Sequence, residues 1–358
     1  MVQSRTVLAL MLLVVFTVGA WAGPMSILPV IDRPGTDAYC QVAQEALGTA
    51  ERSIDILLSN GEWEDNPLWD VIIAAHGRGV EVRVLLDQSD WAPAITEKNR
   101  PTVDALRAYG IDARLDDPET TIHAKLVVVD RRAALLGSSN WNDHAFLDQE
   151  QTNVLIDDPR VGEAFCAVFD RVWNGDLDPG GLALPEAPNG AVATVVPVLD
   201  VDSTALYAEL ALQALAMASE SVHLVMYRLS VYPGYGDSAA NRLVAALVAA
   251  AGRGIDVRVV LDDCNYYPES AQANLTAALY LAEQGIAVRF DEPNVTTHAK
   301  LVLVDGRHTL LGSTNWNYYS VERNIEANAA LLGMPEVARI YEAFFERVWS
   351  EGREIADR

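Results

Sequence analysis

The sequence predicts a layered α/β protein built from two copies of one folding unit. Residues 27–32 recur as residues 195–200, and the similarity between the two parts continues nearly to the end of the chain. Within each part, helical and extended patterns of apolar residues alternate, as is typical of an α/β fold. A long internal repeat of this kind indicates duplication. We expect copies over 23–174 and 195–358, joined by a linker over 175–194 that is rich in Pro, Gly and Ala.

The elements of the first copy can be assigned in order. A helix over 37–50 leads to a strand over 54–58, and a second helix over 68–76 leads to a buried strand over 80–86. A Gly-Arg-Gly triplet follows this second helix and its counterpart in the other copy, and we interpret both triplets as helix stops rather than phosphate-binding loops. Each copy closes with an amphipathic helix, which in the second copy begins at Pro335.

The first 22 residues resemble a secretory signal. Arg5 precedes an apolar run over 7–20, and the small residues Ala20 and Ala22 suit a cleavage site. We therefore expect a signal peptide over 1–22 and a secreted or extracytoplasmic protein. The alternative is an uncleaved segment that anchors the protein to a membrane.

Composition narrows the possible functions. The chain has 358 residues, of which 50% are hydrophobic and 21% charged, and this excludes a disordered or collagen-like protein. Its formal charge of −24 disfavours broad electrostatic attraction to nucleic acid, so we expect no stable nucleic-acid partner. The chain has three cysteines, Cys40, Cys166 and Cys264, so at most one disulfide bond is possible. Their spacing matches no zinc or redox motif.

The strongest similarity between the copies lies in segments rich in polar groups. Residues 121–130 match 296–305, and residues 137–142 match 312–317. Side chains on a strand repeat every two residues, so the histidine and the lysine of each first segment should face the same side. The chain contains only three lysines, and two of them occupy these equivalent positions. An ammonium retained twice beside a histidine indicates contact with phosphate oxygens.

Both pairs of segments contain the pattern His-x-Lys-x4-Asp-x6-Gly-Ser-x-Asn, which resembles the mark of the phospholipase D superfamily. The resemblance covers nearly the whole chain after residue 22. It implies two mixed β-sheets flanked by helices, with the halves related by a pseudo-twofold axis and both motifs in one cleft between them. It implies neither a metal nor another cofactor. Because both motifs lie in one chain, we expect a monomer.

The resemblance also assigns roles to residues. Of the two histidines, His123 would attack phosphorus to form a phosphohistidine, and His298 would act as acid and base. The motif lysines and asparagines would bind the non-bridging oxygens, and the serines would donate to the same oxygens or order their loop. The catalytic set implied by the motif is His123, Lys125, Asp130, His298, Lys300 and Asp305, and the phosphate-binding set is Ser138, Asn140, Ser313 and Asn315.

Two features leave alternatives open. Asp130 and Asp305 lie seven residues beyond their histidines, an odd spacing that on a strand would turn them away from the site, so a structural role competes with a catalytic one. Family members often have a glutamate that orients a histidine, and Glu326 fits this role. The equivalent position in the first copy is Gln151, next to Glu150, so it stays open which carboxylate, if any, orients a histidine there.

The leading hypothesis is a secreted phosphodiesterase that hydrolyses phospholipids at a membrane surface to phosphatidic acid and a free head-group alcohol. The alternatives are a phosphatidyltransferase of the cardiolipin-synthase kind, a secreted nuclease of the same superfamily, and a non-catalytic phosphate-binding module. The second copy has seven extra residues near Tyr227, Tyr232 and Tyr235, where aromatic side chains could shape an entrance for a head group or acyl chain.

Overall fold

The computed structural model describes residues 14–16, 25–90, 92–178, 193–236, 238–263 and 267–357. The predicted signal peptide (1–22) and linker (175–194) lie largely outside these ranges, as does Cys264. Within residues 1–22, strand β1 (Val14–Phe16) pairs antiparallel with β2 (Met25–Asp32). Cys40 and Cys166 are buried free thiols. None of the helices in the described ranges has the length and apolar character needed to cross a membrane.

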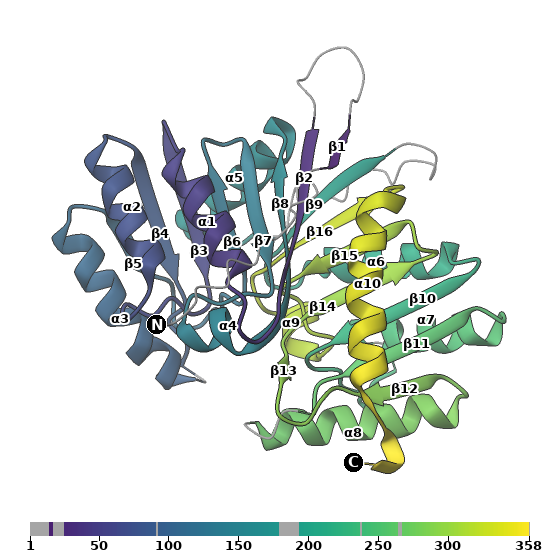
Figure 1. Ribbon diagram of the computed structural model, residues 1–358. Helices are drawn as coiled ribbons and strands as arrows, with labels where there is room; N and C mark the ends of the chain where they lie inside the picture. The colour runs from purple at the N-terminus through teal and green to yellow at the C-terminus, as the bar shows by residue number, and fades with distance from the viewer. Residues whose placement is uncertain are drawn as a thin grey trace, which may run out of the picture.

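The first copy forms one mixed sheet (Figure 1). After β2, the strands follow in the spatial order β8 (Gln149–Asp157), β7 (Ala133–Gly137), β6 (Lys125–Val129), β3 (Ser53–Leu58), β4 (Glu81–Leu86) and β5 (Asp112–Leu115). The last three, β3, β4 and β5, run parallel to one another, and the pairs β2–β8, β8–β7, β7–β6 and β6–β3 are antiparallel.

The second copy repeats the order of the seven strands from β2 to β5 and adds β17 beyond the last of them. Its parallel strands are β10, β11 and β12, and its remaining pairs are antiparallel. The spatial order is β9 (Thr194–Asp200), β16 (Glu326–Leu332), β15 (His308–Gly312), β14 (Lys300–Val304), β10 (Ser221–Met226), β11 (Asp256–Leu261), β12 (Ala287–Phe290) and β17 (Arg353–Glu354). The expectation of two mixed sheets in a duplicated α/β fold is confirmed.

Helices cover the outer faces of the two sheets and fill the space between them (Figure 1). The outer helices of the first copy are α1 (Ala38–Gly48), α2 (Pro67–Gly77) and α3 (Pro93–Ala108). Those of the second copy are α6 (Leu206–Met217), α7 (Ala239–Gly252) and α8 (Pro268–Glu283). The closing helices α5 (Pro159–Trp173) and α10 (Pro335–Glu351) lie between the sheets, and the short helices α4 (Asp143–Leu147) and α9 (Tyr318–Glu322) follow the two motifs.

The helix boundaries follow from local chemistry. Proline stands in the first turn of α2, α5 and α10. The N–H groups of a first turn have no partner within the helix, so the missing N–H of proline costs no hydrogen bond there. The Gly-Arg-Gly triplets end α2 and α7, and their last glycines, Gly79 and Gly254, have φ of 96° and 86°. Side chains other than glycine rarely adopt this left-handed conformation. The interpretation of both triplets as helix stops is therefore confirmed.

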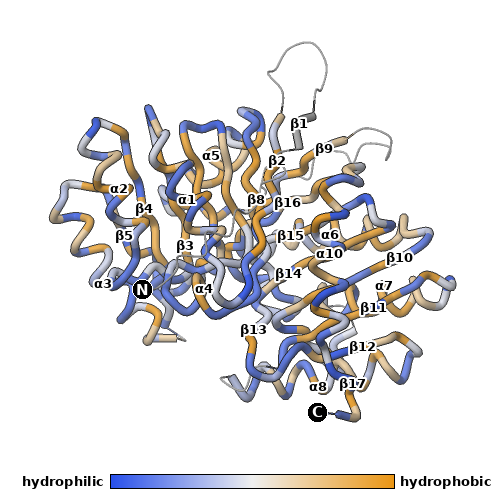
Figure 2. The backbone as a smooth tube through the Cα atoms, in the orientation of Figure 1, coloured by the Kyte–Doolittle hydropathy of each residue, from blue (hydrophilic) through white to orange (hydrophobic). Residues whose placement is uncertain are grey.

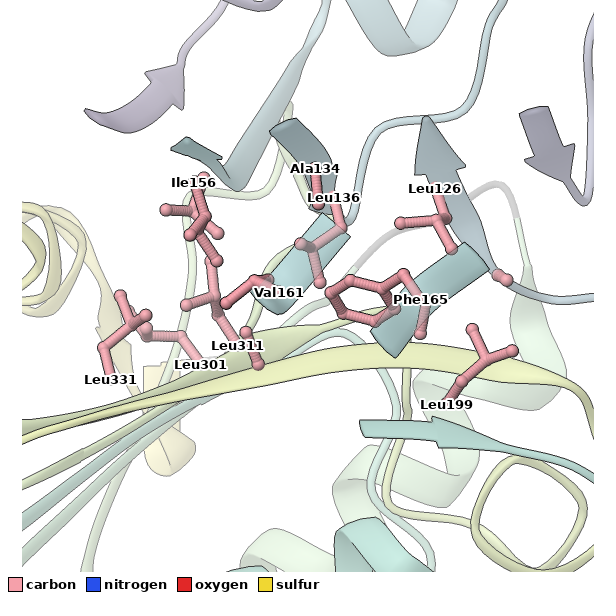
Figure 3. Packing of buried hydrophobic residues seen from close by; sticks show 14 of the residues in the cluster. Leu126, Ala134, Leu136, Ile156, Val161, Phe165, Leu199, Leu301, Leu311 and Leu331 are labelled. Atoms are coloured by element: carbon pink, nitrogen blue, oxygen red, sulfur yellow. The ribbon is translucent and has the colours of Figure 1, made fainter. Parts of the chain in front are cut away.

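One hydrophobic core spans both copies. Phe165 of α5 packs among leucines of the two sheets, including Leu136 and Leu311 (Figure 3). Tyr341 of α10 donates a hydrogen bond of 2.7 Å to the carbonyl oxygen of Asn153 in the opposite sheet. The strands are apolar along most of their length, while polar residues gather in the loops (Figure 2). Because the core is shared, each copy fixes the position of the other.

Candidate active site

The backbone before each motif histidine crosses to the other copy. Ile122 forms a parallel bridge with Ile325, and the N–H of His123 donates to the Ile325 carbonyl at 2.9 Å. In the second copy β13 (Thr296–Thr297) pairs with β8, and the N–H of His298 donates to the Glu150 carbonyl, also at 2.9 Å. Strands β6 and β14 begin only at the lysines, so the histidines precede the strands. This crossing brings the two motifs together between the copies.

His123 is held by a carboxylate of the other copy. Its Nδ1 lies 2.9 Å from both carboxylate oxygens of the fully buried Glu326. Burial lowers the pKa of His123 below its usual value, and the opposing attraction of Glu326 reduces this effect. Since Nδ1–H donates to Glu326, the lone pair of the neutral ring is on Nε2. The histidine that Glu326 contacts is that of the first copy, and its orienting role stays a prediction that this contact supports.

His298 is held by neutral acceptors instead. Its Nδ1 lies 2.9 Å from the carbonyl oxygen of Ser138 and 3.2 Å from Oε1 of Gln151. Both are acceptors, so Nδ1 carries the proton and Nε2 the lone pair. Burial first, and then the charges of Lys300 and Lys125, hold the pKa of His298 well below its usual value. The ring also meets the Tyr227 ring edge-on, with centroids 4.7 Å apart.

The two motif lysines lie beneath the histidines. The Nζ of Lys125 donates to the His123 carbonyl at 2.6 Å, and the Nζ of Lys300 donates to the His298 carbonyl at 2.5 Å. Burial lowers the pKa of Lys125 to about 8. For Lys300, burial and repulsion by Lys125 hold the pKa well below its usual value. A bound anion would relieve this repulsion, so the pair suits a phosphate group.

The motif asparagines leave polar atoms unused by the protein. Within the described part of the chain, the side-chain oxygens of Asn140 and Asn315 are buried and have no hydrogen-bond partner. These oxygens are acceptors, so they do not bond to phosphate oxygens; only the N–H groups of the same amides could donate to a phosphate. The assignment of Asn140 and Asn315 to phosphate binding stays a prediction.

The motif serine hydroxyls are bonded within the protein, contrary to the phosphate-binding role assigned to them. The Ser138 hydroxyl donates to Gln151 at 2.6 Å and accepts from the Thr152 N–H. The Ser313 hydroxyl donates to Glu326 and accepts from the next N–H on that strand. Both side chains are fully buried. Each serine therefore contacts the residue that lies against a motif histidine, a role different from both that were expected of it.

Asp130 and Asp305 are also removed from the catalytic set. Each follows the far end of the strand that its motif lysine begins. The Asp130 carboxylate accepts backbone N–H groups of Glu51, Arg52 and Ser53 at 2.7 to 3.3 Å. Asp305 does the same for residues 219–221. These bonds tie the turn after one strand to the start of its neighbour, so the role is structural, as the odd spacing suggested.

The alternative left open in the first copy is now decided. The Glu150 carboxylate forms a bidentate ion pair with Arg347 of α10, at 3.0 and 2.5 Å, and does not reach a histidine. The adjacent side chain, Gln151, meets His298. Among the described residues, therefore, an amide rather than a carboxylate occupies the position equivalent to Glu326.

Sequence reasoning missed a pair of buried aspartates. Asp87 follows β4 and accepts the N–H of Ile122 at 2.7 Å, while Asp262 follows β11 and accepts the N–H of Thr297 at 2.8 Å. Each thus holds the residue directly before a motif histidine. Burial, and repulsion by Asp116, raise the pKa of Asp87 to about 8. The signal was available, because both copies place Leu-Asp at the end of the equivalent strand.

The described residues contain no group of three or more His, Cys, Asp or Glu side chains able to hold a metal ion. The polar side chains gathered at the site are those of the two motif histidines with Glu326 and Gln151, the two motif lysines and the two motif asparagines.

Comparison with protein families and curated proteins agrees with this chemistry. A family model described as "Cardiolipin synthase, PLD-like domain" matches residues 44–173 and 211–349. The mitochondrial cardiolipin hydrolase of Chlamydomonas reinhardtii is 30% identical over 128 residues, which is 36% of this chain and 54% of the relative. Cardiolipin synthase A of Escherichia fergusonii is 24% identical over 284 residues, 73% of this chain and 56% of the relative. The chain thus spans just over half the length of these relatives.

Solved structures share the fold across both copies. The phosphatidylserine synthase of Haemophilus influenzae Rd KW20 superposes with a TM-score of 0.71 at 12% identity, covering 91% of this chain and 88% of that one. The polyphosphate kinase of Porphyromonas gingivalis gives a TM-score of 0.62 at 16% identity, over 89% of this chain and 50% of that one. At these identities the likeness concerns the fold alone.

Proposed function

The chain belongs to the phospholipase D superfamily, and from this premise we propose that it hydrolyses phospholipids to phosphatidic acid and a free head-group alcohol. The observation that carries the proposal is the pairing of two motif histidines from opposite copies, of which His298 is buried and the His123 side chain is 20% exposed. Each has Nδ1 hydrogen-bonded to an acceptor and therefore Nε2 available for reaction, and each has a motif lysine beneath it.

In the first step, Nε2 of His123 attacks phosphorus and the bond to the head-group oxygen breaks. The ring acquires positive charge as the phosphohistidine forms, and the Glu326 carboxylate at Nδ1 stabilises that charge. This is the reason for assigning the nucleophile to His123 rather than to His298, which lacks a carboxylate partner. Lys125 and Lys300, with Asn140 and Asn315, would hold the non-bridging oxygens.

The leaving alkoxide takes a proton from His298. The negative charge of bound substrate opposes the lysine charges that lower the pKa of His298, so its protonated form becomes accessible in the complex. A weakly basic imidazole, once protonated, is also a strong acid toward the alkoxide. In the second step neutral His298 takes a proton from water, the hydroxide attacks phosphorus, and His123 leaves.

Two observations favour a phospholipid over a nucleic acid. The relatives found by sequence are named as cardiolipin hydrolases and cardiolipin synthases. The charge of −24 opposes long-range attraction of a polyanion such as DNA. The predicted signal peptide leads us to propose that the protein acts outside the cytoplasm. Fractionation of cells that produce it would test this, and retention in the cytoplasm would contradict it.

Phosphatidyl transfer is the second candidate. The similarity to cardiolipin synthase A runs over 73% of the chain and so includes both copies, whereas the cardiolipin hydrolase matches 36%. The two reactions share the phosphohistidine and differ only in whether water or an alcohol resolves it. The acceptor therefore decides between them.

A phosphorus NMR time course of the purified protein with mixed phospholipid micelles and ethanol, run beside a plasmid digest, tests the proposal. We expect phosphatidic acid, some phosphatidylethanol and intact plasmid. A product made only with alcohol present would favour the transferase, whereas plasmid cleavage with untouched lipid would replace both candidates with a nuclease.

The same system identifies the nucleophile. Rapid denaturation during turnover of phosphorus-labelled lipid should leave label on His123 in the wild type and in His298→Gln, and none in His123→Gln. Label on His298 would reverse the assignment.

A further inference from the structure

Tyrosines of the second copy extend from the catalytic centre to the surface. Tyr227 follows β10, and its ring meets His298 and lies 4.8 Å from the Nζ of Lys300. Farther along, the chain enters the loop that contains the seven extra residues, with Tyr232 and Tyr235. This loop thus begins at the reacting histidine.

A second segment with tyrosines packs against this loop. The N–H of Ser230 donates to the Trp316 carbonyl at 2.9 Å, directly after the motif. Two residues later, the N–H of Tyr318 donates to the Tyr232 hydroxyl at 3.0 Å. The Tyr318 and Tyr319 rings, at the start of α9, meet edge-on at 5.3 Å. We call Tyr232, Tyr235, Tyr318 and Tyr319 the tyrosine rim.

The tyrosine rim presents large rings to solvent. Tyr235 is 72% exposed and Tyr319 67% exposed, with Tyr318 at 37%. Single exposed aromatic residues are ordinary on protein surfaces, whereas a group of them beside a catalytic centre indicates a binding surface. A tyrosine ring is apolar along its body and polar at its tip, and such residues concentrate at the boundary between lipid and water.

The duplication supplies an internal comparison. The first-copy residues equivalent to Tyr318 and Tyr319 are Asp143 and His144, both exposed and polar. The first copy also lacks the seven extra residues. The fold therefore does not require rings at these positions, and their presence in one copy calls for a functional reason.

We propose that the tyrosine rim docks the protein on the surface of a phospholipid bilayer, with its rings at head-group level. The inference rests on the proposed function, since it supplies the way in which a membrane lipid reaches His298. The chain's charge of −24 opposes capture by anionic lipid. Docking must then come from ring insertion and should favour zwitterionic membranes.

The test measures co-sedimentation with phosphatidylcholine vesicles, in a His123→Gln background so that no lipid is consumed. The rim variant is Tyr235→Ser/Tyr319→Ser. The matched control is Tyr109→Ser/Tyr280→Ser, which removes two other exposed tyrosines. Tyr109 ends α3 and Tyr280 lies in the last turn of α8, each shortly before the start of β5 or β12, so both lie at the end of the parallel strands opposite the end that carries the site.

We expect the rim variant to bind vesicles about tenfold more weakly than the control variant, with little change on adding salt. In the active protein, the ratio of turnover on vesicles to turnover on a soluble short-chain phospholipid should fall by a similar factor. Equal vesicle binding by rim and control variants, or binding abolished by salt, would overturn the docking proposal.

The two proposals fail in different ways. Rim-dependent vesicle binding by a protein that cleaves no phospholipid would support docking and reject the hydrolase. Phospholipid cleavage, together with equal vesicle binding by the rim and control variants, would support the hydrolase and reject docking.

Discussion

Glu326 of the second copy holds His123 of the first, with Nδ1 2.9 Å from each carboxylate oxygen. The reciprocal contact, from Gln151 of the first copy to His298 of the second, uses a neutral amide. Each copy therefore contacts the histidine of the other, but only His123 has a carboxylate at its Nδ1. The duplicated halves thus give their two histidines different chemical properties, as two steps with opposite proton demands require.

Replacing Glu326 with Gln should lower kcat roughly 100-fold, because the amide keeps a hydrogen-bond partner for His123 but removes the charge that stabilises the phosphohistidine. Steady-state kinetics on micellar lipid would show it. A matched control is Glu342→Gln, which alters another carboxylate on a histidine Nδ1, the 2.7 Å contact with His223 outside the site. Equal losses in both variants would mean that Glu326 matters only for folding.

Gln151→Glu should raise the pKa of His298 by placing a carboxylate at its Nδ1. The protonated ring is the form that acts as an acid, so a higher pKa keeps it active to higher pH. We expect the descending limb of the kcat profile to move upward by about one pH unit. An unmoved limb, with the ascending limb shifted instead, would indicate that His298 acts as the nucleophile.

Anion binding should weaken above pH 8. The pKa of Lys125 is lowered to about 8, so the ammonium is present below this pH and is lost as the pH rises through it. Sulfate keeps a constant charge over this range, and its inhibition constant should rise with pH from about 8 upward. As a control, Lys98→Ala should leave this pH dependence unchanged, because Lys98 is exposed and pairs with Glu62. A sulfate affinity that is flat to pH 10 would contradict a binding role for Lys125.

Asp130→Asn should destabilise the fold without impairing the folded enzyme. The pKa of Asp130 is lowered, with three backbone N–H groups favouring its charged form. Its stabilisation is therefore present above the pKa of the unfolded chain and is lost as pH falls through the folded value. We expect a loss of roughly 1–2 kcal/mol at pH 7, shrinking in acid, from denaturant unfolding. A large fall in kcat with stability intact would return Asp130 to the catalytic set.

Asp87→Asn should show the opposite dependence on pH. The pKa of Asp87 is raised to about 8, so the folded state holds its proton more tightly than the unfolded chain. The contribution of Asp87 to stability is present below about pH 4 and declines as pH rises to about 8. The wild type should lose unfolding free energy relative to the variant between pH 5 and pH 9. A constant difference would show that Asp87 does not titrate in this range.

Much of the fold was predictable because its signals are local. Apolar periodicity gave the strand over 80–86 and the closing helix that begins at Pro335, and glycine chemistry gave the helix stops. The repeat in sequence predicted the repeated strand order. The roles of the motif serines were less accessible, because whether a hydroxyl faces substrate or a neighbouring strand depends on pairing over a long sequence distance.

The sequence by itself determined that this protein is a duplicated α/β chain with two His-Lys motifs, since periodicity and residue identity suffice for that. Only the tertiary structure decided that Glu326 serves His123, that Gln151 serves His298, and that Glu150 turns to Arg347. These partners lie between 147 and 203 residues apart in the chain. No local pattern encodes such a choice, because it follows from how two sheets and their shared core place the crossing segments against each other.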